Sequence, residues 1–150
     1  MGQAPLTLPP AGTVYIDTQV LIYTVERHPS FSPVLATLWQ AAQDRRLHVA
    51  TSDLTLMEVL VSPLRRGDSA LQQRYESVLF NPDTRLVPIT QSVLRRAAGL
   101  RASTPTLRTP DAIHAASAID AGCTLFLTND VDFRRVMGLP VTILRDAVVP

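Results

Sequence analysis

The pattern of apolar and polar positions divides the chain into short strands that alternate with helices. Apolar runs rich in β-branched and aromatic residues predict β-strands at 13–17, 47–51, 85–89, 125–127 and 141–144. Apolar residues at helical spacing predict helices at 18–27, 33–46, 53–61, 69–80, 90–101 and 110–121, with a helical turn at 133–136. This alternation favours a parallel sheet covered on both faces by helices.

Individual residues mark the ends of these elements. Ser52 is a good N-cap for the helix that follows it, and Pro63 is expected to end or kink that helix. The last long helix has Thr109 as its expected cap and Pro110 at its first position. Pro88 has no N–H to donate to a neighbouring strand, so the third strand is expected at an edge of the sheet.

Length and composition predict a single domain over residues 1–150. Apolar residues make up 46% of the chain and charged residues 18%, which favours a well-filled core over disorder. A chain of this length buries about 70% of its unfolded surface, so folding needs no disulfide or metal. Residues 1–11 are uncharged and contain several prolines, and they are expected to form a loose lead-in.

The cysteine content and the first residues bear on location. Cys123 is the single cysteine and cannot form an internal disulfide, which favours a reduced compartment, and we expect the cytoplasm. The first twelve residues contain neither a basic segment nor a long apolar run. We therefore expect no signal peptide and no association with a membrane.

The positive charge is carried by arginine alone. The net charge is +1, and all fourteen basic residues are Arg. Codon usage in a GC-rich genome is one explanation of this bias, and the suitability of guanidinium groups for binding phosphate is the other. The absence of lysine excludes any mechanism that needs an amine base or a Schiff base.

Four acidic residues are predicted to meet at one edge of the sheet. Asp17 ends the first strand and Asp130 follows the fourth, so both lie at the carboxyl edge, where ligands bind in open parallel sheets. Asp111 is in the first turn of a helix that runs antiparallel to the strands, which brings it to the same edge. Glu58 lies on the apolar stripe of its helix and needs a partner, because burial of an unpaired charge is costly.

Each acid also has an ordinary structural explanation. Asp17 could cap the next helix, and Asp111 could be a first-turn helix acid. Asp130 and Asp132 could be turn residues, and Glu58 could pair with an arginine. The convergence of all four predicted positions favours a functional site.

Such a cluster requires protons or a cation. Two like charges about 4 Å apart repel by about 4 kcal/mol at an effective dielectric near 20. No His or Cys is expected at matching spacing, so the ligands are all hard oxygen atoms, which favours Mg²⁺ or Mn²⁺ over Zn²⁺. A metal ion held by carboxylates, with positions open to water and phosphate, is suited to phosphodiester hydrolysis.

Four segments, taken together and in this order, carry a family resemblance. They are residues 14–23 (VYIDTQVLIY), 51–60 (TSDLTLMEVL), 109–116 (TPDAIHAA) and 126–133 (FLTNDVDF). Each motif alone is weak, but the ordered set resembles the PIN-domain nucleases, specifically the VapC-type toxin ribonucleases. The resemblance extends from about residue 13 to residue 144.

The resemblance implies a PIN-like α/β fold, a three-layer α/β/α sandwich with a central, mostly parallel five-stranded sheet. It also implies an endoribonuclease that depends on Mg²⁺ or Mn²⁺, acts as the toxin of a toxin–antitoxin pair, forms homodimers and binds a small cognate antitoxin. By position, the catalytic and metal-binding acids are Asp17, Glu58, Asp111 and Asp130, with Asp132 as a candidate outer ligand. Thr18 and Thr128 match small hydroxyl positions beside the acids.

Other residues near these motifs have both a functional and a structural explanation. Arg108, Arg134 and Arg135 are candidates to bind RNA phosphates, although a solvated helix face explains them about as well. His114 is better explained by packing or hydrogen bonding than as a base.

Three other classes of protein are alternatives to a nuclease. A phosphoryl-accepting receiver would need a lysine, and a hydrolase with an Asp nucleophile would need a second Asp where Gln19 stands. The main alternative is a PIN-fold module that binds RNA or protein without significant turnover.

Overall fold

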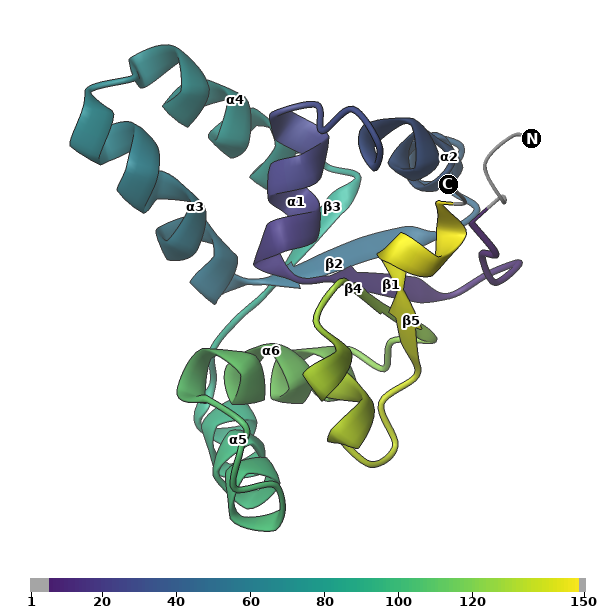
Figure 1. Cartoon of the computed structure of the whole chain (residues 1–150), viewed down its shortest axis with the longest axis vertical. Helices are drawn as coiled ribbons and strands as arrows, with labels where there is room; N and C mark the ends of the chain where they lie inside the picture. The colour runs from purple at the N-terminus through teal and green to yellow at the C-terminus, as the bar shows by residue number, and fades with distance from the viewer. Residues whose placement is uncertain (1–5, 149–150) are drawn as a thin grey trace.

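The computed structural model describes residues 6–148, and within this range the chain forms a five-stranded sheet and six α-helices (Figure 1). The strands are β1 (Thr13–Ile16), β2 (His48–Ser52), β3 (Thr84–Val87), β4 (Leu125–Thr128) and β5 (Val141–Ile143). The α-helices are α1 (Thr18–Val25), α2 (Ser32–Gln43), α3 (Asp53–Arg66), α4 (Ser69–Leu79), α5 (Gln91–Ser103) and α6 (Thr109–Asp120). Two 3₁₀ helices follow β4 and β5, namely η1 (Val131–Arg135) and η2 (Leu144–Ala147).

All strand pairs are parallel, and the strand order is β3-β2-β1-β4-β5. The chain therefore extends the sheet first on one side of β1 and then on the other, and the order reverses between β1 and β4. Ile16 pairs with Leu127 in the register of these two strands, so the residues that follow them leave the sheet side by side. This is the topological switch point at which parallel sheets bind ligands.

Helices cover both faces of the sheet and make three layers. Helices α1 to α4 lie on one side and α5 and α6 on the other (Figure 1). Side chains alternate along β1, so Val14 and Ile16 belong to the first apolar cluster and Tyr15 to the second. The predicted α/β/α sandwich and the edge position of β3 are confirmed.

Helix α6 packs closely on the second face because its inward side chains are small. Four of its alanines are fully buried, and the helix contacts α5, β2 and α3. These alanines are Ala112, Ala115, Ala116 and Ala118.

Two details of the helices differ from prediction. Helix α3 does not end at Pro63 but continues through it to Arg66, and it is capped by Gly67, which has φ of 62°. Thr109 is the first residue of α6 rather than its cap, and its hydroxyl accepts a hydrogen bond from Arg101 Nη1 at 3.0 Å. Both predictions rested on the preferences of single residues for helix ends, and the observed ends differ from them.

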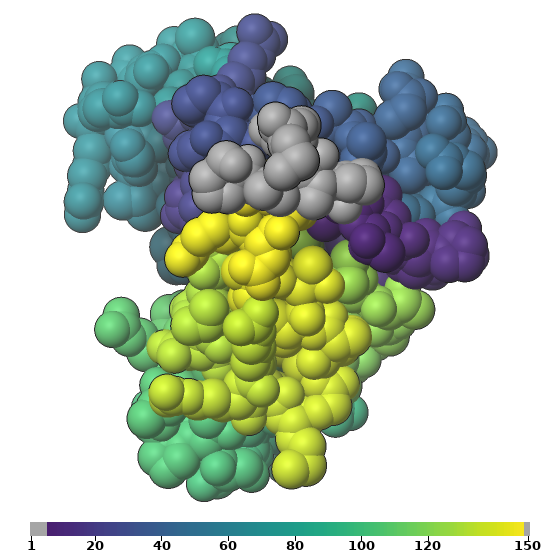
Figure 2. All heavy atoms as spheres, turned by 45° about the vertical axis from the view of Figure 1, so that its right-hand side comes forward, coloured from purple at the N-terminus to yellow at the C-terminus, as the bar shows by residue number. Residues whose placement is uncertain are grey.

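The two end segments of the described chain lie together on one surface. Residues 1–5 of the predicted lead-in are outside the described residues, but Leu6 is buried in the same apolar cluster as Ala147. Figure 2 shows the N-terminal segment in purple beside the C-terminal segment in yellow. Among residues 6–148, no helix is both long enough and apolar enough to span a membrane.

Gly12, just before β1, provides a test of how closely the chain packs against Thr124. Its φ is 106°, and a Cβ at this position would lie 2.7 Å from Thr124 Oγ1. We expect Gly12→Ala to lower the free energy of unfolding by about 1–3 kcal/mol, measured by urea denaturation. The control is Gly99→Ala in α5, where a Cβ meets no atom within 4 Å. We expect the control to stabilise the protein by about 0.5–1 kcal/mol, and equal effects of the two variants would contradict the packing described.

Candidate functional site

A cavity of about 600 Å³ opens at the carboxyl edge of the sheet, and the four acids singled out in the sequence all line it. They come from four separate parts of the fold. Asp17 follows β1, Glu58 is in α3, Asp111 is in the first turn of α6, and Asp130 follows β4. The parallel topology therefore brings together residues that are up to 113 positions apart, from Asp17 to Asp130.

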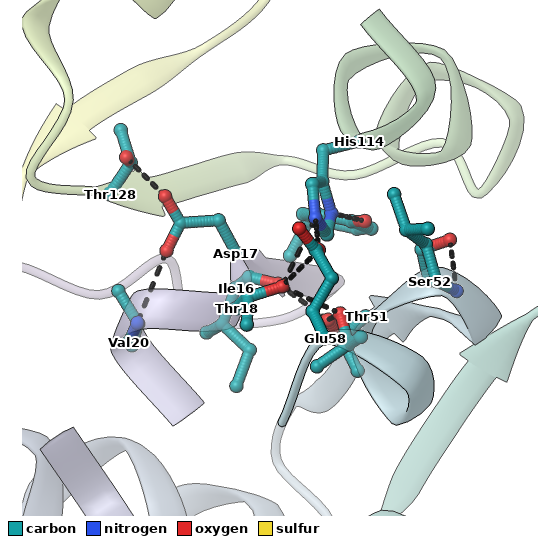
Figure 3. A network of polar contacts seen from close by, with 12 residues as sticks. Ile16, Asp17, Thr18, Val20, Thr51, Ser52, Glu58, His114 and Thr128 are labelled. Carbon is teal, nitrogen blue, oxygen red and sulfur yellow. Dashed lines mark hydrogen bonds and ion pairs between the residues drawn. The ribbon is translucent and has the colours of Figure 1, made fainter. Parts of the chain in front are cut away.

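Asp17 is both a helix cap and part of the cavity wall. Its Oδ1 accepts a hydrogen bond from the backbone N–H of Val20 at 3.1 Å, and its Oδ2 accepts one from the Thr128 hydroxyl (Figure 3). The side chain is almost fully buried, and this burial raises the pKa of Asp17, although the Thr128 hydrogen bond opposes the shift. Asp17 therefore caps α1 and, with the same side chain, lines the cavity.

Glu58 is paired with a hydroxyl and an imidazole, not with an arginine. Its Oε1 is 2.6 Å from the Thr18 Oγ1 and 2.8 Å from the His114 Nε2 (Figure 3). Burial alone would raise the pKa of Glu58, but hydrogen bonds from His114 and Thr18 outweigh burial and hold this pKa below its usual value. Glu58 is therefore kept ionised at the cavity.

His114 belongs to the cavity, contrary to the expectation that no histidine has matching spacing. The interpretation of His114 as a hydrogen-bonded residue is confirmed, since it is buried and contacts Glu58 and Tyr15. It also lines the cavity. Its position three residues after Asp111 was the available signal, because residues at this spacing lie on one face of a helix.

Asp111 and Asp130 are close enough to influence each other. Burial raises the pKa of Asp111, and the negative charge of Asp130 raises it further, while His114 and Arg108 oppose the shift. The Asp130 carboxylate is oriented by the backbone N–H of Asp132, which donates to its Oδ1 at 2.9 Å. The Asp132 side chain is exposed, is not among the residues that line the cavity, and lies 4.0 Å from Arg135 Nη2.

The arginines near the site differ in what they contact. Arg134 forms an ion pair with Asp146 at 3.2 Å, and Arg135 donates to the Thr106 hydroxyl at 3.2 Å. Neither lines the cavity, whereas Arg145, which the sequence analysis missed, does. It lies in η2, two residues after the end of β5, so the argument that placed Asp17 and Asp130 at the carboxyl edge could have found it.

Asn129 fixes the position of Arg145 at the cavity. The Arg145 backbone N–H donates to Asn129 Oδ1 at 2.7 Å, and its guanidinium Nη2 donates to the Asn129 carbonyl at 3.0 Å. A cation is therefore held at the rim of a cavity whose charged side chains are otherwise acidic.

The residues present suit a hard divalent cation by their chemistry. Carboxylate oxygens are the ligands that Mg²⁺ and Mn²⁺ prefer. Burial raises the pKa of both Asp17 and Asp111, and neighbouring carboxylates add to it, which is the type of charge excess that a cation relieves. Over residues 6–148, however, no three His, Cys, Asp or Glu side chains are already grouped closely enough to hold a metal ion.

The fold and the cavity define a class of three-layer α/β proteins with an acidic site at the switch point of a parallel sheet. The sequence matches the PIN domain family over residues 14–139, and the chain belongs to this family.

Several solved structures share the fold. VapBC2 from Rickettsia felis, bound to a DNA fragment from its promoter, has a TM-score of 0.71 and 18% identity, covering 87% of this chain and 98% of that one. A toxin–antitoxin complex from Klebsiella pneumoniae has a TM-score of 0.63 and 25% identity, covering 87% and 97%. VapBC-5 from Mycobacterium tuberculosis has a TM-score of 0.55 and 23% identity, covering 90% and 98%. Among curated proteins, none gives a significant match.

The raised pKa of Asp17 leads to a prediction about stability. A carboxyl group whose pKa is higher in the folded state than in the unfolded state destabilises the fold when it is ionised, and this cost disappears as the pH falls through the folded-state pKa. We expect Asp17→Asn, in metal-free buffer near pH 7, to raise the free energy of unfolding, because asparagine removes the buried charge. Asparagine also keeps the ability to cap α1.

The matched control removes the opposing hydrogen bond instead of the charge. Thr128→Val leaves the buried Asp17 Oδ2 without its hydroxyl donor, and we expect it to destabilise the protein by about 1–3 kcal/mol. Thermal and urea unfolding of both variants measure these changes. If Asp17→Asn lost as much stability as Thr128→Val, the conclusion that the charge of Asp17 destabilises the fold would be wrong.

Proposed function

We propose that the protein is a metal-dependent endoribonuclease and the toxin of a toxin–antitoxin pair. The observation that carries the proposal is the convergence of Asp17, Glu58, Asp111 and Asp130 on one cavity at the switch point of a parallel sheet. Membership of the PIN domain family supports a nuclease, and the similar structures of toxin–antitoxin complexes support the pairing with an antitoxin.

In this proposal the four carboxylates hold one or more Mg²⁺ or Mn²⁺ ions. A cation held there would lower the pKa of a water molecule, so that this water could attack a phosphodiester, and it would offset charge on the leaving oxygen. Thr18 and His114 keep Glu58 ionised and fix its orientation. The Thr128 hydroxyl and the Val20 N–H do the same for Asp17, whose burial would otherwise favour the protonated form.

The proposed substrate is RNA, and arginine supplies its phosphate contacts. Arg145 is the strongest candidate because it lines the cavity and is held by Asn129. Arg108 precedes α6 and lies near enough to Asp111 to oppose the rise in its pKa. Arg134 and Arg135 are exposed beside these residues and stay candidates for more distant phosphates.

We also propose a small cognate antitoxin and a homodimer as the assembly. Helix α3 supports a protein interface because three of its apolar side chains, Met57, Val61 and Leu64, are 57%, 38% and 60% exposed. The single PIN domain over residues 1–150 and the cytoplasmic location stay predictions from the sequence.

Cleavage tests the proposal directly. We expect the protein to cut RNA with Mn²⁺ or Mg²⁺, and removal of the metal with a chelator to abolish cutting. Asp130→Asn removes a cavity carboxylate and should lower the rate at least ~100-fold. The control is Asp132→Asn, two residues away, which keeps the backbone N–H that orients Asp130 and should cut at close to the wild-type rate. Equal rates for these variants, or RNA bound by the wild type without any cleavage, would instead favour the binding-module alternative.

Substrate binding gives a second test. Arg145→Gln removes the guanidinium that lines the cavity, and we expect weaker RNA binding and a slope of log K against log salt that is smaller by about one unit. Arg134→Gln is the matched control, since that guanidinium is already paired with Asp146 outside the cavity. Fluorescence anisotropy of a labelled RNA at several salt concentrations measures both variants. A larger loss in Arg134→Gln would contradict the role given to Arg145.

A further inference from the structure

A buried polar network connects Glu58 to the core beneath the site. Tyr15 in β1 is fully buried, with its ring stacked on Phe126 at a centroid distance of 5.1 Å. Its hydroxyl lies 2.7 Å from Nδ1 of His114, and Nε2 of His114 lies 2.8 Å from Glu58 Oε1. The imidazole of His114 thus lies between the Tyr15 hydroxyl at Nδ1 and the Glu58 carboxylate at Nε2.

The partners determine which ring nitrogen carries the hydrogen. A carboxylate oxygen can only accept, so the Nε2 that faces Glu58 carries the hydrogen. The Nδ1 of a neutral ring then offers a lone pair to the hydrogen of the Tyr15 hydroxyl. Glu58 therefore requires the tautomer with hydrogen on Nε2, and Tyr15 stabilises this tautomer by donating its hydroxyl hydrogen to Nδ1.

Both hydrogen bonds to Glu58 fall on the same oxygen. Thr18 Oγ1 and His114 Nε2 contact Oε1, and they lie 3.1 Å from each other, so the three groups form a closed triangle. No hydrogen bond among residues 6–148 is made to Oε2, and Glu58 lines the cavity. One oxygen anchors the carboxylate, which leaves the other for a ligand in the cavity.

We infer that Tyr15 and His114 are positioning residues that fix the Glu58 carboxylate for cation binding, with Tyr15 acting only through the tautomer of His114. The inference rests on the proposed function, because it concerns the same cavity. Neither residue needs to touch the cation or the RNA. Partners behind a ligand typically change metal affinity by about 10–100-fold when they are removed.

Two buried tyrosines provide a matched pair of variants. Tyr15→Phe removes the hydroxyl that contacts His114 and keeps the ring that stacks on Phe126. Tyr75→Phe removes the hydroxyl of a second tyrosine with a buried ring, in α4, which donates to Glu26 away from the cavity. We expect Tyr15→Phe to weaken Mn²⁺ binding roughly three- to tenfold by calorimetry, below the range for a direct partner because its effect is transmitted. Tyr75→Phe should bind Mn²⁺ as the wild type does.

Variants of His114 separate positioning from packing. His114→Leu removes the donor to Glu58 and should weaken Mn²⁺ binding roughly 10–100-fold. His114→Gln can place an N–H near the position of Nε2 and should restore most of that loss. Long-range ¹H–¹⁵N spectra of the wild type should show hydrogen on Nε2 of His114, and Tyr15→Phe should shift this tautomer balance while Tyr75→Phe leaves it unchanged.

The outcomes separate this inference from the proposed function. Equal Mn²⁺ affinity in Tyr15→Phe and Tyr75→Phe overturns the inference, as does wild-type affinity in His114→Leu or hydrogen on Nδ1 in the wild-type spectrum. If Tyr15→Phe fails to fold, the comparison of His114→Leu with His114→Gln decides, since equal affinity in that pair also overturns it. A wild-type protein that binds no Mn²⁺ overturns the proposed function, and the inference with it.

Discussion

Burial of the Asp17 carboxylate at the end of β1 is the constraint on which the rest of the sheet edge depends. A carboxylate in this position is costly unless hydrogen-bond donors reach it, and the donors come from the two neighbouring elements, the first turn of α1 and the end of β4. The same contacts join β1 to β4 where the strand order reverses. The group that opposes folding through its charge is therefore also the group around which the cavity is assembled.

The environments of the cavity acids push their pKa values in opposite directions. Burial raises the pKa of Asp17 and Asp111, whereas two donors hold the pKa of Glu58 low. Opposed environments of this kind are typical of functional sites, because a fold gains no stability from gathering like charges. The hydrogen bonds to Glu58 outweigh its burial, whereas burial prevails at Asp17 and Asp111, which carry the type of charge excess that a cation would relieve.

The residues at the sheet edge could be predicted from the sequence because their positions follow from the order and direction of the strands and helices. Once the alternation of strands and helices is recognised, Asp17, Asp111 and Asp130 must lie at one edge, and the cavity lining agrees. The role of His114 could not be predicted in this way, since its contacts depend on how closely two layers approach. Propensity also predicted an end or a kink of the helix at Pro63, whereas α3 continues to Arg66.

The buried alanines of α6 set the width of the site. They let the helix lie close to the sheet, and α6 carries both Asp111 and His114, while Glu58 is on the opposite layer. Because a helix moves as a rigid body, a larger side chain at any of these alanines displaces both residues together. The alanine face thus acts as a spacer, and a change far from any charged group can open or close the gap between the two halves of the site.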